Sequence, residues 1–258
     1  MQTKMTAEKY LKKLLENLWK KSCGGLLAES PKNLAKKLLA KFWILACAML
    51  FSSALAQAQM QAQIAEGEDY ITLQEPLPNA QNTLIEVYSY ACPFCYKYSK
   101  ILPQVIENLP QGMVFKPYHL EQKGSYGKSA NLVFAALITI DENKGVDIND
   151  EKLSAFQKAK RAYFDEYHMK KNRWKNGADE AGFVQSGLKA AGVSDEEYRL
   201  ALEQPRAKEL LKEWGSSYKI ALVQGIPAFV VNGKYLIKTN AIKSIEDLSA
   251  KIKELAEK

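Results

Sequence analysis

Two cysteines separated by two residues are the strongest chemical signal in the sequence. They stand in the motif Cys92-Pro93-Phe94-Cys95, which follows a dense run of β-branched and aromatic residues over 83–90 and opens a stretch of helical character. A strand that leads into a helix places the first cysteine beside unpaired backbone N–H groups and the positive end of the helix dipole. We therefore expect the pKa of Cys92 to lie below that of a free cysteine, which is about 8.5.

The two cysteines are expected to have different roles. Pro93 suits the first helical position because it has no N–H to lose. Cys95 lies one turn deeper and is less exposed, so it is placed to attack a mixed disulfide formed at Cys92. The sequence thus predicts that Cys92 and Cys95 are catalytic and that their disulfide serves in place of a cofactor.

A C-x-x-C motif is also half of a structural zinc site, which requires four ligands. Downstream of the leader described below, the remaining nitrogen ligands are His119 and His168, and neither has ligand spacing to the other or to the cysteines. We therefore expect no metal site, and the sequence assigns neither histidine a role.

The N-terminal segment has the organisation of an export signal. Residues 1–56 contain ten lysines and three acidic residues, so they account for the whole net charge of +7. A lysine-rich region is followed by an apolar run and by Ala54-Leu55-Ala56, which fits a cleavage site, with a second candidate ending at Ala58. The apolar stretch over 42–56 is shorter than the roughly 20 residues of a membrane-spanning helix. We predict a cleaved leader; the purpose of residues 1–30 is not evident from the sequence.

Cleavage near Ala56 or Ala58 would change which cysteines the mature protein contains. Of the four cysteines, Cys23 and Cys47 would be removed, and only the C-x-x-C pair would remain. A disulfide that closes so small a ring stabilises a fold little, so the pair is typical of catalytic use in an exported protein. The remainder of the chain is balanced in charge, so we expect no nucleic-acid binding.

Hydrophobic periodicity predicts two groups of strands separated by helices. Strands are expected over 69–73, 83–90 and 113–120, and again over 228–231 and 235–237 around an Asn232-Gly233 turn. Helices are expected over 93–109, 128–140, 150–169 and 179–190, from a cap at Ser194, over 205–223, and from a cap at Ser244. This order indicates an α/β chain with a leader (1–56), a first part carrying the motif (57–124), a helical insertion (125–222) and a second part (223–258).

Two further features are candidate parts of the site. Ile226-Pro227 precedes the terminal hairpin, where a proline often marks strand entry; in thioredoxin-like folds a cis-proline here faces the C-x-x-C and its neighbours pair with an extended substrate. Glu86 lies six residues before Cys92, and it is either a buried proton relay or an edge-exposed residue. Lys97 and Lys100 either raise the local positive potential or form a solvated helix face.

The chain resembles the DsbA family of disulfide-introducing enzymes from about Tyr70 to the C-terminus. The motif Cys92-Pro93-Phe94-Cys95, with Tyr96 after it, and the segment over 225–235 carry the resemblance. Residues 89–98, 119–121, 126–128, 167–168 and 173–174 look most like the DsbL branch. Phe94 departs from the histidine usual in DsbA enzymes, which removes one stabiliser of the thiolate.

The resemblance implies a thioredoxin fold with an inserted all-helical domain, an exposed nucleophile at Cys92, a buried partner at Cys95, and a cis-proline loop at Ile226-Pro227. It implies a periplasmic enzyme that oxidises reduced exported proteins, and we expect this enzyme to be a monomer. A DsbB- or DsbI-like quinone-reducing membrane protein would reoxidise the enzyme. The branch further implies an arylsulfate sulfotransferase as substrate. The alternatives are an isomerase or reductase, and a non-catalytic peptide-binding module.

Overall fold

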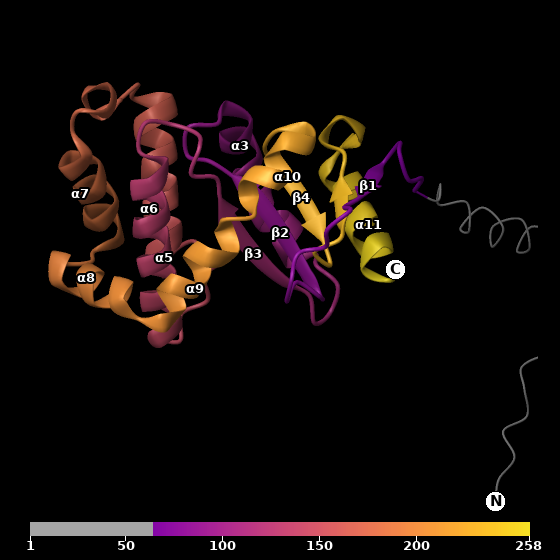
Figure 1. The fold of residues 1–258 in the computed structure, drawn as a ribbon, viewed down its shortest axis with the longest axis horizontal. Helices are drawn as coiled ribbons and strands as arrows, with labels where there is room; N and C mark the ends of the chain where they lie inside the picture. The colour runs from indigo at the N-terminus through magenta and orange to yellow at the C-terminus, as the bar shows by residue number, and fades with distance from the viewer. Residues whose placement is uncertain (1–63) are drawn as a thin grey trace, which may run out of the picture. The chain divides into compact units, whose positions relative to one another are not determined.

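The computed structural model describes residues 64–258 (Figure 1). The predicted leader, both candidate cleavage sites and residues 57–63 lie outside the described residues. Within the described part, no helix combines the length and hydrophobicity needed to span a bilayer.

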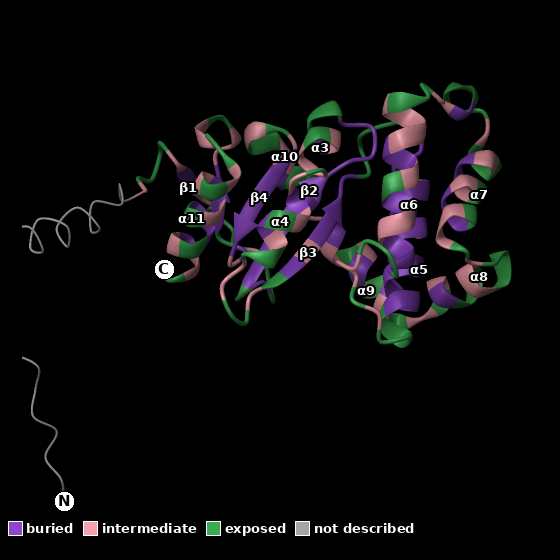
Figure 2. Ribbon diagram, turned by 180° about the vertical axis from the view of Figure 1, so that it is seen from behind, coloured by how far each residue is buried: buried purple, intermediate pink, exposed green. Residues whose placement is uncertain are grey.

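A five-stranded mixed sheet carries the motif. Its spatial order is β1 (Tyr70–Thr72), β5 (Tyr235–Ile237), β4 (Ala228–Val231), β2 (Thr83–Tyr88) and β3 (Val114–His119). The central strand β2 runs parallel to β3 and antiparallel to β4, and all six of its residues are buried (Figure 2). The prediction of a buried strand leading into the C-x-x-C is confirmed.

Successive side chains of β2 point to opposite faces of the sheet and therefore pack in two different hydrophobic clusters. Leu84 packs in a cluster with Leu102 of α4 (Leu102–Glu107) and Leu248 of α11 (Ile245–Ala256). Its neighbours Ile85 and Val87 belong to the other cluster, which extends into the helices between β3 and β4. Burial on both faces is why β2 reads as an almost continuous apolar run.

The helical block lies to one side of the sheet (Figure 1). Its helices are α5 (Gly127–Asn143), α6 (Ala155–Phe164), α7 (Glu180–Ala191), α8 (Asp195–Glu203) and α9 (Pro205–Trp214), whereas α10 (Ser217–Gln224) packs against β2 and β4 of the sheet. A π-helical turn (Asp165–Met169) and a short 3₁₀ helix (Trp174–Gly177) connect α6 to α7. Helix α5 is the most buried of these helices, with α6, α7, α8 and α9 packed around it.

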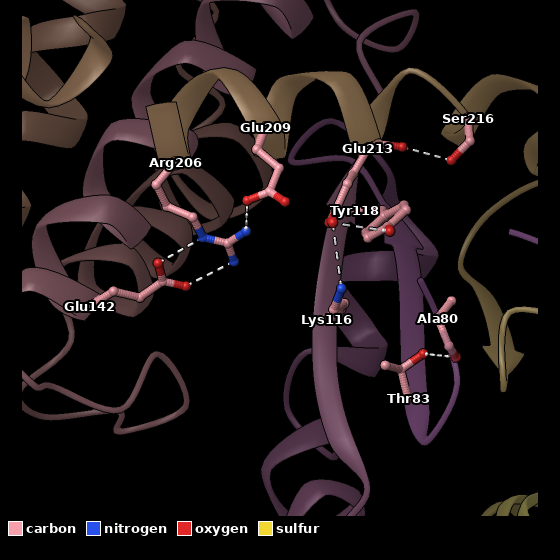
Figure 3. Close-up of polar contacts among 9 residues, drawn as sticks. All are labelled: Ala80, Thr83, Lys116, Tyr118, Glu142, Arg206, Glu209, Glu213 and Ser216. Atoms are coloured by element: carbon pink, nitrogen blue, oxygen red, sulfur yellow. Dashed lines mark hydrogen bonds and ion pairs between the residues drawn. The ribbon is translucent and has the colours of Figure 1, made fainter. Parts of the chain in front are cut away.

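Helix α9 connects this block to the sheet (Figure 3). At its first turn, Arg206 pairs with Glu142 of α5 at 2.7 Å and with Glu209 at 2.8 Å. At its last turn, Glu213 accepts a hydrogen bond from the Tyr118 hydroxyl at 3.3 Å and pairs with Lys116 at 3.5 Å, both on β3. The helix therefore contacts both the block and the edge strand.

Three expected helices differ from those observed. The helix expected over 93–109 is two helices, α3 (Pro93–Tyr98) and α4, because the Pro103 ring would clash with the Ser99 carbonyl in a continuous helix. The helix expected over 150–169 begins as α6 after Ser154, whose hydroxyl caps it. The helix expected over 205–223 is divided into α9 and α10 at Gly215 and Ser216, both weak helix formers.

The caps and the hairpin were predicted more accurately. The hydroxyls of Ser194 and Ser244 each accept the N–H three residues on, at 3.2 Å. Asn232 and Gly233 both have positive φ, and the Lys234 N–H closes the turn onto the Val231 carbonyl at 3.0 Å. The first paired residues of β4 and β5 are Val231 and Tyr235. Three residues therefore lie between the two strands, one more than in a two-residue turn.

Candidate active site

Cys92 lies at the junction of the strand and the helix, as predicted. It is the N-cap of α3, with extended backbone angles (φ −89°, ψ 118°), and its Sγ accepts the Cys95 N–H at 3.2 Å. The extended conformation turns Sγ back over the first helical turn, where the N–H groups have no partner within the helix. A sulfur in this position is suited to carry negative charge.

The resemblance implied an exposed Cys92, and this expectation is wrong for the structure described here. The residue is 2 % exposed and Cys95 is fully buried, and the two thiols are not joined in a disulfide. One of its contacts comes from the loop before β4: the Cys92 thiol donates to the Ile226 carbonyl oxygen, 3.4 Å from Sγ. Phe94, beside it on α3, is 60 % exposed.

The two thiols are perturbed in opposite directions. A hydrogen bond from the Cys95 thiol, with further donation from the backbone N–H groups of Cys95 and Phe94 and the charge of Lys123, lowers the pKa of Cys92 to about 7, although burial opposes the shift. Burial raises the pKa of Cys95 well above its ordinary value, and the nearby Cys92 and Glu86 charges raise it further. The structure therefore assigns the thiolate to Cys92.

A lysine that the sequence analysis did not single out contributes positive charge at Cys92. Lys123, in the loop after β3, lowers its pKa. Lys97 lies 5.4 Å from the Phe94 ring centroid, and Lys100 lies 4.6 Å from that of Tyr96. The sequence offered no signal for Lys123, because it reaches the site only through the pairing of β2 with β3.

Glu86 is buried, so the interpretation of this residue as edge-exposed is wrong. Its side chain is fully shielded on β2, and Oε2 lies 3.0 Å from Nζ of Lys160, whose side chain is only 4 % exposed. Within the described part of the chain, the other carboxylate oxygen has no hydrogen-bond partner. Lys160 comes from α6 of the helical block, 74 residues away in sequence, so this partner was not predictable from local pattern.

The peptide bond between Ile226 and Pro227 is cis, and this loop faces Cys92 through the Ile226 carbonyl. Four of the predicted residues, Cys92, Cys95, Ile226 and Pro227, thus come together although the loop and the motif are more than 130 residues apart. Among residues 64–258, no group of three or more His, Cys, Asp or Glu side chains is arranged to hold a metal ion.

Both histidines lie beside the segment that enters the motif. The Tyr90 N–H donates to Nε2 of His119 at 3.2 Å, and Nε2 of His168 lies 2.8 Å from the Tyr90 carbonyl oxygen. Burial lowers the pKa of His119 to about 3, so this ring is neutral. Sequence reasoning gave these residues no role, since neither contact follows from spacing.

Taken together, the sheet order, the C-x-x-C at the end of the central strand, the facing cis-proline loop and the helices inserted between β3 and β4 define a thioredoxin-like fold with a helical insertion and a dithiol site. The DSBA-like thioredoxin domain family matches residues 83–253. The chain belongs to the DsbA family of thiol:disulfide oxidoreductases.

Known relatives place it nearer to DsbL than to DsbA. The thiol:disulfide interchange protein DsbL of Escherichia coli O6:H1 is 49 % identical over 81 % of this chain and 95 % of its own length. DsbA of Dickeya dadantii is 29 % identical over 78 % of this chain and 88 % of its own length. The crystal structure of DsbL from Salmonella enterica serovar Typhimurium superposes with a TM-score of 0.73 at 48 % identity, covering 76 % of this chain and 98 % of that one.

Proposed function

We propose that this protein introduces disulfide bonds into exported proteins in the periplasm, with the Cys92–Cys95 disulfide as the donor. The observation that carries the proposal is the opposite perturbation of the two thiols. Stabilising the Cys92 thiolate stabilises the reduced enzyme, and a stable reduced form makes the disulfide a stronger oxidant.

The exchange proceeds in two balanced steps. A substrate thiolate attacks Cys92 Sγ of the disulfide; the bond to Cys95 breaks, Cys95 leaves with the electron pair and takes up a proton. A second substrate thiolate then attacks the substrate sulfur of the mixed disulfide, which forms the substrate disulfide and releases Cys92 as a thiolate. The low pKa of Cys92 favours the second step because it makes Cys92 the better leaving group.

Other residues have proposed roles in these steps. We propose that Ile226 and Pro227 dock an extended substrate segment beside Cys92, a role supported by the contact between the Ile226 carbonyl and Sγ. Pro93 and Phe94, expected as an active-site loop, form the first turn of α3, and the exposed Phe94 ring would contact the substrate. Glu86 would relay the proton that Cys95 takes up, a role supported by its burial and its influence on the pKa of Cys95.

Location and partners are inferred from the family and from the leader. We propose that the leader directs export and is cleaved near Ala56 or Ala58, that the enzyme acts as a monomer, and that a DsbB- or DsbI-like membrane protein reoxidises it with quinone. The similarity to DsbL supports a restricted substrate, for which an arylsulfate sulfotransferase is our candidate.

The direction of exchange can be tested by rapid alkylation of thiols in cells that express the protein. We expect the Cys92–Cys95 pair of the wild type to be mostly oxidised. The Cys95→Ala variant should accumulate covalent complexes with its substrates. Identifying the trapped proteins would test whether an arylsulfate sulfotransferase is a substrate. A Cys92→Ser, Cys95→Ala double variant is the control and should form no complex. A mostly reduced pair would indicate a reductase or isomerase, and substrate maturation by Cys92→Ser would indicate a peptide-binding module.

A further inference from the structure

The backbone of one residue, Tyr90, is held by both histidines of the chain. Because a carbonyl oxygen can only accept, Nε2 of His168 carries the proton and donates to Tyr90. Because the Tyr90 N–H must donate, Nε2 of His119 is unprotonated, and its Nδ1 donates to Oδ1 of Asn131 at 2.6 Å. The two rings therefore act in opposite senses, one as acceptor and one as donor.

Tyr90 needs such partners because of its position. The ladder of β2 ends at Tyr88, and residues 89–91 are buried but unpaired by the sheet. Buried peptide groups outside a ladder require other partners. Ser89 supplies one of them, since its Oγ accepts the Ala91 N–H at 3.2 Å and donates to the Lys123 carbonyl at 3.0 Å. The backbone two residues before Cys92 is thus held by side chains.

His168 also contacts the segment that follows Cys92. Its ring stacks on that of Tyr96 of α3, with centroids 5.0 Å apart and an interplanar angle of 6°. The Tyr96 hydroxyl donates to Asp165 at 3.3 Å, and Asp165 and His168 belong to the same π-helical turn. One turn of the helical block therefore bridges the end of β2 and the start of α3, with Cys92 between the two contacts.

We propose that His168 is a positioning residue for the Cys92 thiolate; the inference rests on the proposed function of this site. By holding Tyr90 on one side of Cys92 and Tyr96 on the other, it keeps Sγ on the N–H groups of Phe94 and Cys95. Those hydrogen bonds stabilise a thiolate more than a neutral disulfide sulfur. The contact therefore favours the reduced enzyme and strengthens the oxidant.

The role requires the Nε2–H and not the charge of the ring. Neutral and protonated imidazole both carry that donor in the observed geometry, and burial lowers the pKa of His168. An amide can replace the donor, whereas a phenyl ring can replace only the stack. His168→Phe and His168→Gln therefore separate the two contacts.

The test measures the equilibrium constant for oxidation of glutathione by the purified protein, together with the Cys92 pKa by thiolate absorbance. We expect His168→Phe to raise the Cys92 pKa and to lower the equilibrium constant about fivefold, the ratio that corresponds to one hydrogen bond of about 1 kcal/mol. His168→Gln should restore part of both. The neighbouring Met169, which is 65 % exposed, supplies the control Met169→Ala, which should match the wild type.

The proposal is overturned if His168→Phe leaves both quantities at wild-type values, or if it lowers only the free energy of unfolding. It is also overturned if His168→Gln is no closer to the wild type than His168→Phe. Failure of the proposed function is a separate result, because a mostly reduced pair in cells would leave these two measurements on the purified protein unaffected.

Discussion

Cys92 and Cys95 differ in what surrounds their sulfurs. The Cys92 sulfur receives hydrogen bonds from the Cys95 thiol and from backbone N–H groups, whereas the Cys95 thiol is fully buried near the negative charge of Glu86. Donation to a sulfur favours its charged form, and burial near a carboxylate favours the neutral form. At neutral pH, about half of the Cys92 sulfurs are therefore thiolates, whereas Cys95 remains a thiol.

The reduced protein should react with iodoacetamide at a rate that rises with pH through a midpoint near 7. Below that pH the Cys92 thiol is protonated and unreactive, and above it the thiolate is present, since the thiolate is the nucleophile. In Cys95→Ala the midpoint should move upward, because the donating thiol is the largest cause of the lowered pKa.

Cys92→Ala is the matched control for this titration. Cys95 is buried and its pKa is raised, so this variant should show no transition near neutral pH. A wild-type midpoint near the free cysteine value of about 8.5 would contradict the assigned thiolate.

At the scale of elements, the start of α6 depends on a buried carboxylate. Asp141, near the end of α5, accepts the Ser154 hydroxyl at 2.7 Å and the N–H groups of Ala155 and Phe156 at 2.8 and 3.0 Å. These N–H groups belong to the first turn of α6 and have no partner inside the helix. Asp141 thereby fixes the position of α6, which carries Lys160, and of the π-helical turn that follows.

Asp141→Ala should lower the free energy of unfolding by at least about 2 kcal/mol, because hydrogen bonds to a charged group contribute about 1.5 to 3 kcal/mol and the N–H groups would be left buried. Urea denaturation followed by circular dichroism measures the change. The exposed cap at Ser194 supplies the comparison, since Ser194→Ala should lose only about 1 kcal/mol. Equal losses in the two variants would contradict the role of Asp141.

At the scale of the whole molecule, the Glu86–Lys160 pair links the helical block to the central strand beneath the site. Both side chains are almost completely buried, and Nζ of Lys160 also lies 4.1 Å from the Tyr88 ring centroid. The same ion pair therefore holds the helical block against β2 and fixes the position of the Glu86 charge that raises the pKa of Cys95.

Lys160→Met should lower the free energy of unfolding by about 3 to 5 kcal/mol, because it leaves Glu86 buried without its partner. Glu86→Gln should also destabilise the fold, and should lower the pKa of Cys95 because it removes a charge that raises it.

The double variant Glu86→Gln, Lys160→Met completes a thermodynamic cycle. It should be more stable than the sum of the two single losses indicates, since no unpaired charge remains. Additive losses would mean that the two side chains do not interact in solution.

The local sequence pattern was sufficient to predict much of the fold and the dithiol chemistry of the C-x-x-C motif. The strand before Cys92, the caps at Ser194 and Ser244 and the turn at Asn232 depend on neighbours within a few residues, so they could be predicted from sequence. Helix lengths were less predictable, because breaks such as those at Pro103 and Gly215 are obscured by continuing apolar periodicity. The limits of the helical insertion at 125 and 222 remain predictions.

The sequence by itself determined that Cys92 and Cys95 form a dithiol pair at a strand–helix junction, since both the strand and the cap are local features. Only the tertiary structure decided what surrounds that pair. The burial of Cys92 under Ile226, the Lys160 partner of Glu86 and the two histidines at Tyr90 all join residues between 29 and 134 positions apart. Such contacts depend on how the sheet and the helical block pack, and no pattern within a short window records that packing.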